Sequence, residues 1–200
     1  MQSHISRMSL VDMLSFGRDT FEKFISTTAK KKVKFSDKWE HVRIPNSIDK
    51  INGSMAKIPE SEILIAGKYP VYTQDIQNNS AGFSNNTNPI TDVPVVLFGD
   101  HSCAVKFIDQ PFFRGADGTV LLKPKKKYNP KYYFYAIEDI VNRFLDKTKY
   151  ERHNKYLQEL YIPNPPTDIQ QQIVAEIEQV ANAAALLTQQ IKPVSYTHLT

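Results

Sequence analysis

The sequence predicts an α+β fold, in which a twisted, mostly antiparallel sheet with flanking helices is followed by a long C-terminal helix of coiled-coil type. Three observations favour this fold. Short apolar, β-branched runs alternate with glycine-containing turns between residues 93 and 122. Residues 132–146 show helical amphipathic spacing. After residue 167, an apolar side chain recurs every third or fourth position.

Length and composition narrow the class of protein. The chain has 200 residues, 41% hydrophobic and 23% charged, which is ordinary for a globular domain with appendages and excludes a disordered or fibrous chain. Its single cysteine excludes an internal disulfide and a cysteine-based zinc site. No apolar run approaches the ~20 residues of a membrane span, and the N-terminus lacks the apolar region of a secretion signal. We therefore expect a cytoplasmic protein without membrane association.

Residues 1–36 are predicted to form an N-terminal helical tail and a basic linker. Apolar residues in the range 9–26 have mostly helical spacing, which indicates one or two short helices. The lysine-rich stretch 29–34 has no core-forming pattern. It is either a solvated linker or an arm that contacts phosphates.

Residues 37–166 are predicted to form the globular domain. An opening strand is expected within 38–47, and a second strand within 63–73, interrupted at Gly67. A long polar loop, 74–88, precedes three short strands at 93–98, 103–108 and 119–122. A helix at 132–146 follows, and then a helical turn and a short strand within 156–162. The apolar face expected on that helix consists of Tyr133, Ile137, Ile140, Val141 and Phe144.

Residues 167–192 are predicted to form a long spacer or dimerisation helix. Prolines at 163, 165 and 166 end the preceding element, and Thr167 to Gln170 has the pattern of a capping box. A helix over 168–191 would be ~36 Å long. It could pack on its own domain, but the narrow stripe favours pairing with another long helix. Residues 193–200 lack this pattern and are predicted to be a disordered or non-native tail. The assembly stripe consists of Ile169, Ile173, Ile177, Val180, Ala184, Leu187 and Ile191.

Catalytic signatures are mostly absent. Asn164 to Thr167 resembles the Asn-Pro-Pro-aromatic signature of amino-methyltransferases, but threonine cannot stack on a flipped base. Gly99 to Cys103 places Asp, His and Ser consecutively, whereas members of a catalytic triad meet in space. The five histidines never form a metal-ligand pair at helical spacing. We therefore expect no catalytic residues, no metal and no cofactor.

A basic region stands out instead. Residues 118–156 carry a net charge of +6, whereas residues 157–200 carry −3. Lysines and arginines neutralise phosphates, and neighbouring Tyr, Asn, Gln and His side chains can reach base edges. Basic loops are also commonly only solvated, so both interpretations stay open. The candidate phosphate contacts are Lys123, Lys125, Lys126, Lys127, Lys131, Lys147, Lys149, Arg152 and Lys155, and the candidate base contacts are Tyr72, Gln74, Asn78 and His153.

The segment YERHNKYLQELYIPNPPTDIQQQIV, residues 150–174, resembles the end of a target-recognition domain from type I restriction–modification specificity subunits. The resemblance extends to sequence patterns of that family at residues 38–42, 67–72 and 96–101. It therefore covers about residues 38–191. It implies a DNA-binding module without catalytic residues that reads one half of a bipartite double-stranded DNA target. The long helix would be half of an antiparallel pair. The implied partners are a methyltransferase (modification) subunit, in restriction complexes the restriction (translocase and nuclease) subunit, and a second recognition domain or a second copy.

Two departures from the family pattern accompany the resemblance. A full specificity subunit has two recognition domains and two long helices, whereas 200 residues leave room for one of each. We therefore expect either a half-subunit that dimerises or a fragment. Residues 9–36 also resemble the tail that joins an adenine methyltransferase to a recognition domain in fused polypeptides. Two other hypotheses stay open: a protein-interaction module that uses the 168–191 helix and contacts DNA non-specifically, and a catalytic methyltransferase or nuclease.

Overall fold

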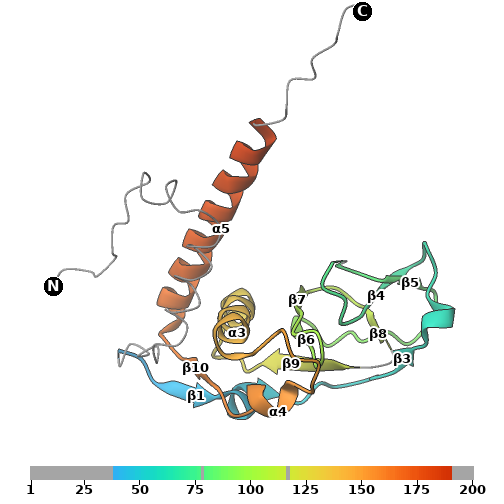
Figure 1. The fold of residues 1–200 in the computed structure, drawn as a ribbon, viewed down its shortest axis with the longest axis horizontal. Helices are drawn as coiled ribbons and strands as arrows, with labels where there is room; N and C mark the ends of the chain where they lie inside the picture. Colours follow the sequence, from blue (N-terminus) through green and yellow to red (C-terminus); the bar gives the residue numbers. More distant parts are fainter. Residues whose placement is uncertain (1–37, 78, 116–117, 191–200) are drawn as a thin grey trace, which may run out of the picture. The chain divides into compact units, whose positions relative to one another are not determined.

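The computed structural model describes residues 38–77, 79–115 and 118–190 (Figure 1). The predicted helices within 9–26, the basic linker and the tail after Lys192 lie outside these ranges. Strands β1 to β9 come first, with two short 3-10 helices among them, and the three described α-helices and β10 follow, so the α+β class is confirmed. From Trp39 onward, the described chain belongs to one compact unit.

A four-stranded antiparallel sheet with the order β2-β9-β6-β7 carries the main core. Three of its strands, β6 (Val95–Gly99), β7 (Val105–Ile108) and β9 (Thr119–Pro124), are the apolar runs predicted from the sequence, and β2 (Ile48–Asp49) joins at the edge. Val96 of β6 lies opposite Phe107 of β7 and Leu122 of β9. Strand β6 is buried along its whole length. Because both of its faces are covered, β6 reads as an unbroken apolar run and not as an alternating one.

Helix α3 (Pro130–Phe144) packs against this sheet and confirms the predicted helix. It begins where the Asn129 side chain accepts hydrogen bonds from the N–H groups of Lys131 and Tyr132, at 2.9 and 3.2 Å. Four of the five predicted face residues are buried, but Phe144 is 37% exposed because the helix ends there. The Ser47 hydroxyl donates to the Ile44 carbonyl, so the Tyr133 hydroxyl, 2.8 Å from Ser47 Oγ, donates to Ser47.

A second four-stranded sheet has the order β3-β8-β4-β5 and its own small core of Ile58, Val71 and Phe113. Its strands are β3 (Lys57–Ile58), β4 (Tyr69–Tyr72), β5 (Gly82–Ser84) and β8 (Phe113–Gly115). The sheets are mostly antiparallel, as predicted, except that β8 pairs in parallel with both β3 and β4. Strand β5 lies inside the segment predicted as a polar loop, where pairing to β4 compensates for its weak strand propensity.

A two-stranded sheet brings the two ends of the described domain together. Strand β1 (His41–Arg43) pairs antiparallel with β10 (Tyr161–Pro163), so that Val42 lies opposite Ile162. The predicted opening strand is shorter than expected, because the 3-10 helix η1 (Ile44–Ser47), with Pro45 in its first turn, follows at once. The short helix α4 (Asn154–Leu157) precedes β10, as the sequence predicted.

Helix α5 (Thr167–Gln190) confirms the predicted long helix. The predicted capping box is wrong for Gln170, whose buried side chain leaves its own helix end. Its Oε1 accepts from the Asn129 N–H at 2.6 Å, and its Nε2 donates to the carbonyls of Lys127 and Pro165, at 3.1 and 2.9 Å. Buried backbone groups require hydrogen-bond partners, and the Gln170 side chain is the partner of three such groups. This side chain therefore joins α5 to the start of α3.

Candidate nucleic-acid interface

The first basic segment, residues 123–131, runs from the end of β9 into α3, and two of its five lysines are held in ion pairs. Lys123 pairs with Asp92, and both side chains are about four-fifths buried. The Asn52 N–H and the Lys123 ammonium lower the pKa of the Asp92 carboxyl below its ordinary value. Lys131 pairs with Glu178 of α5 at 2.5 Å. These two lysines therefore serve the fold in this conformation.

The remaining lysines of the first basic segment point toward solvent to different degrees. Lys126 and Lys127 are exposed, and Lys125 is half-buried. The Lys127 ammonium lies 5.2 Å from the centre of the Tyr128 ring. Burial raises the pKa of Tyr128 to about 12, so this tyrosine stays neutral beside the lysine. Lys126 and Lys127 are thus the best-placed cations of this segment for a phosphate.

The second basic segment, residues 147–155, connects α3 to α4, and its four cations are exposed. Its lysines make only surface contacts, which contribute little to stability and leave the charges accessible. These contacts join Lys147 Nζ to Asn142 Oδ1 at 2.5 Å, Lys149 Nζ to Asp146 Oδ2 at 3.5 Å, and Lys155 Nζ to Glu151 Oε2 at 3.6 Å.

The two basic segments lie at opposite ends of α3. The helix has 15 residues, so its ends are ~22 Å apart at 1.5 Å per residue. That separation corresponds to about six base pairs of duplex DNA at 3.4 Å per step.

Tyr72, predicted to contact base edges, is a core residue. Its side chain is 5% exposed, and its ring packs edge-on against Phe112 with centroids 5.7 Å apart. Its hydroxyl accepts from Gln110 Nε2 at 3.4 Å. The ring therefore presents no polar edge to a groove in this conformation, because both faces of β4 are covered: Val71 packs in one core cluster and Tyr72 in another. Asn78, another predicted base contact, lies outside the described residues.

His153, also predicted to contact DNA, is 1% exposed and anchors the second basic segment. Its backbone N–H donates to the Asp100 carbonyl at 2.8 Å, and its Nε2 lies 3.0 Å from the Lys149 carbonyl oxygen. The Asp100 carboxylate also accepts from the Asn154 N–H at 2.8 Å. The backbone of His153 and Asn154 therefore holds the segment to the β6–β7 turn, and the buried imidazole braces the segment internally at Lys149.

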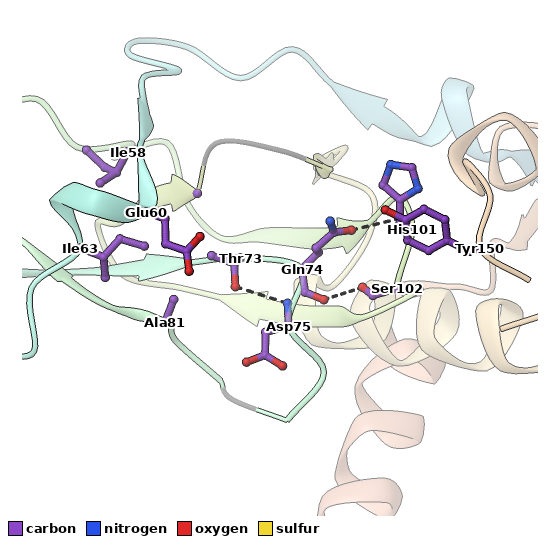
Figure 2. A pocket seen from close by; sticks show the side chains of 11 residues that line it. Ile58, Glu60, Ile63, Thr73, Gln74, Asp75, Ala81, His101, Ser102 and Tyr150 are labelled. Atoms are coloured by element: carbon purple, nitrogen blue, oxygen red, sulfur yellow. Dashed lines mark hydrogen bonds between the residues drawn. The ribbon is translucent and has the colours of Figure 1, made fainter. Parts of the chain in front are cut away.

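Gln74, the remaining predicted base contact, lies in a cleft of about 810 Å³ (Figure 2). Residues from six places in the sequence line the cleft, and Ala81 and Gly115 are two of these places. Ile58 and Glu60 come from the end of β3 and from the 3-10 helix η2 (Glu60–Glu62). Residues 73–75 follow β4, residues 101–102 form the β6–β7 turn, and Tyr150 belongs to the second basic segment. A volume in this range suits a small ligand or a single nucleotide.

Hydrogen bonds hold both the side chain and the backbone of Gln74. Its Oε1 accepts from the His101 N–H at 3.2 Å, and its carbonyl accepts from the Ser102 hydroxyl at 2.5 Å. A Cβ at Gly118 would lie 2.5 Å from Gln74 Nε2, and one at Gly99 would lie 2.9 Å from Gln74 Cβ. Gly118 also has a φ of +66°. Glycine at these two positions therefore lets Gln74 pack against the neighbouring turns.

An aromatic pair at the rim of the cleft is not predictable from the sequence. The rings of His101 and Tyr150 are stacked, with centroids 5.1 Å apart and an interplanar angle of 16°. Tyr150 is 88% exposed. The two residues are 49 positions apart, so no local pattern could have indicated their contact.

The predicted assembly stripe on α5 divides into two parts. Ile169, Ile173 and Ile177 are half-buried, and Ile173 packs on the main core. Val180 is 69% exposed, and Ala184 is exposed too. The Leu187 side chain and Ile191 lie outside what the structure describes. The described domain therefore covers only the first half of the stripe, as the length of the helix suggested.

A comparison with protein families shows which family the chain belongs to. The profile described as "Type I restriction modification DNA specificity domain" matches residues 36–195. The chain belongs to this family. The specificity domain supplies DNA recognition in type I systems and is non-catalytic, in agreement with the sequence prediction. Among curated proteins, no match to the chain is found.

Solved structures of type I systems share the fold of this specificity domain. The first, described as the basis of complex assembly and conformational transition of the type I R-M system, aligns with a TM-score of 0.60 at 17% identity, covering 86% of this chain and 47% of that chain. The HsdS subunit from Thermoanaerobacter tengcongensis aligns with a TM-score of 0.53 at 18% identity, covering 86% and 46%. The S subunit from M. genitalium aligns with a TM-score of 0.54 at 21% identity, covering 78% and 44%. The specificity domain therefore spans less than half the length of each of these chains.

Within the described part of the specificity domain, no group of three or more His, Cys, Asp and Glu side chains is arranged to hold a metal ion. None of its described helices combines the length and apolar character needed to span a membrane.

Proposed function

We propose that this specificity domain reads one half of a bipartite DNA target through the cleft around Gln74 and the two basic segments. The observation that carries the proposal is the position of Gln74. A glutamine amide can donate to and accept from adenine in the major groove, and Oε1 of Gln74 keeps a second lone pair besides the one that accepts from the His101 N–H. Gln74 also lies beside the second basic segment, whose cations can pair with phosphates. Because the tight packing around Gln74 restricts its side chain, the amide would lose little entropy on binding.

Assembly is the second part of the proposal. The exposed distal part of α5 would pair with another long helix, from a second copy or from a second recognition domain, and would set the spacing between two half-sites. A methyltransferase (modification) subunit would dock on this assembly, as would the restriction subunit in a restriction complex. We place this function in the cytoplasm, as predicted from the sequence, with no cofactor of the domain's own.

Selection from a random-sequence duplex pool tests the recognition step. The chain should enrich one contiguous motif of no more than about six base pairs, the span between the two basic segments. Gln74→Ala should relax the preference at one position of the motif by ~1–3 kcal/mol and leave the others unchanged. Gln77→Ala, an exposed glutamine of the same loop, is the matched control and should enrich the original motif. An unchanged motif after Gln74→Ala would contradict the assigned role.

The alternative is a protein-interaction module in which α5 recruits a partner and DNA contact is non-specific. The exposed apolar residues Val180 and Leu186 favour it, at 69% and 61% exposed. The same selection separates the two hypotheses. Binding of the duplex pool by the protein without enrichment of any motif would favour the alternative.

A further inference from the structure

The His101–Tyr150 pair forms a preordered aromatic surface. Tyr150 covers His101 with one ring face, and its 88% exposure leaves the outer face open. The backbone of His101 is fixed by Gln74 Oε1, which sets the position of the imidazole. His101 Nδ1 is buried, and no hydrogen-bond partner for it is found within the described residues. An exposed aromatic ring held in place in this way can stack on another flat group at little entropic cost.

The cleft beside this pair has the wrong charge for a phosphate. Two of its lining residues, Glu60 and Asp75, are acidic, and none of the lining residues is Lys or Arg. Figure 2 shows both carboxyl groups across the cleft from the aromatic pair, with Gln74 between them. The Asp75 carboxylate already accepts from the Gln77 N–H at 2.9 Å and also interacts with the Lys106 ammonium, so part of its charge is offset. Carboxylates accept hydrogen bonds from amino groups, including the N4 amine of cytosine.

The surroundings of Tyr150 carry the opposite charge. Lys147, Lys149 and Arg152 flank it in the second basic segment and are all exposed. A cationic peptide drawn to the acidic cleft would be repelled by these three side chains. A nucleotide fits both charges, because its phosphates would meet the cations and its base the aromatic ring. Basic residues interleaved with stacking aromatics are typical of surfaces that bind unpaired nucleic acid.

We propose that the outer face of Tyr150 is a stacking platform for an unpaired base of the bound DNA, and that the cleft beyond it accepts the exocyclic amine of that base. The base must be unpaired and unstacked, because neighbours cover both of its faces inside a duplex. This inference rests on the proposed function, since it assumes that the domain binds DNA. It assigns a role to Tyr150, and it names amine-bearing bases as the class of ligand.

Binding of short single-stranded oligomers, measured by fluorescence anisotropy at neutral pH, tests this proposal. Oligodeoxycytidine and oligodeoxyuridine are the matched probes, because uracil carries a carbonyl where cytosine carries the amine. The wild-type chain should bind oligodeoxycytidine about fivefold or more tighter. Tyr150→Ala should weaken binding of both oligomers by about fivefold or more, and Tyr150→Phe should preserve it. Glu60→Gln should reduce the preference for cytosine. Tyr161→Ala, a half-exposed tyrosine on β10, is the control and should bind like wild type.

Equal affinity for the two oligomers, or unchanged affinity after Tyr150→Ala, would overturn the proposal. A random-sequence duplex measured in parallel separates this failure from failure of the proposed function. If the duplex is still bound and its affinity falls with salt, only the stacking role is lost. If the duplex is not bound, DNA recognition itself fails. Oligolysine binding that Glu60→Gln abolishes would reassign the cleft to a cationic peptide and overturn the proposal.

Discussion

At the scale of single residues, the lysines of the first basic segment differ in what they already contact. Lys123 is paired with Asp92, whereas Lys126 is exposed. Each phosphate contact contributes about −0.9 to the slope of log affinity against log salt. We therefore expect Lys126→Met to make the slope for a random-sequence duplex less negative by about one, and Lys123→Met to leave it nearly unchanged. Equal effects of the two substitutions would show that the ion pair of Lys123 opens on binding.

The same ion pair predicts a dependence of stability on pH. The folded protein holds the pKa of Asp92 below its ordinary value of 3.8, first through the Asn52 N–H and then through Lys123. The resulting stabilisation is fully present above pH 3.8 and is lost as the pH falls through the folded pKa. Urea titrations at neutral and at acidic pH should therefore show a larger loss for wild type than for Asp92→Asn. Asp109→Asn, at an exposed aspartate, should behave like wild type. Parallel losses in wild type and Asp92→Asn would contradict this assignment.

Gln170 is the residue with the largest predicted effect on stability. Gln170→Ala would leave the Asn129 N–H and the carbonyls of Lys127 and Pro165 without their partner. Unsatisfied buried groups cost roughly 1–3 kcal/mol each, and relaxation toward water reduces the sum, so we expect a loss of about 3 kcal/mol in the free energy of unfolding. Gln171→Ala, at the exposed neighbouring position, should change it by less than about 0.5 kcal/mol. Comparable losses in the two variants would contradict the role of the side chain.

At the scale of elements, α5 is the test of assembly. Val180→Asp places a charge on the exposed part of the stripe, so the domain should stay folded while pairing of the helix is lost. Gln179→Asp adds the same charge one position away from the stripe and should leave assembly intact. Sedimentation of both variants beside wild type measures this. A paired assembly that persists in Val180→Asp would contradict pairing through this face. Ile173 is a poor choice for the test, because it also packs on its own domain.

Elements with a strong local pattern were predictable. Helices α3 and α5 and strands β6, β7 and β9 follow from periodicity and turn residues, which act within a few positions. Strand β5 was not predictable, because its polar sequence forms a strand only through pairing with β4. The same limit applies to the site. Of the predicted base contacts, Gln74 lines the cleft, whereas Tyr72 and His153 are buried, and their burial depends on the tertiary fold. The stacking of His101 on Tyr150 depends on the tertiary fold as well.

At the scale of the whole molecule, the mild net charge of +4 is distributed unevenly over separate surfaces. The basic segments lie at the two ends of α3, the acidic cleft lies beside the second of them, and the distal part of α5 extends beyond the core. Under the proposed function, non-specific attraction to phosphates and recognition of bases belong to different surfaces. Substitutions in the basic segments should change affinity for all DNA sequences, whereas those in the cleft should change the preference among sequences.

The salt dependence of DNA affinity tests the central claim most directly. If about six phosphates are neutralised, log affinity for duplex DNA should fall against log salt with a slope of about −5. Titrations of the full chain at increasing potassium chloride, with a fluorescent duplex as the probe, give this slope. A slope near −5 would agree with DNA recognition through the two basic segments, and a slope near zero would contradict it.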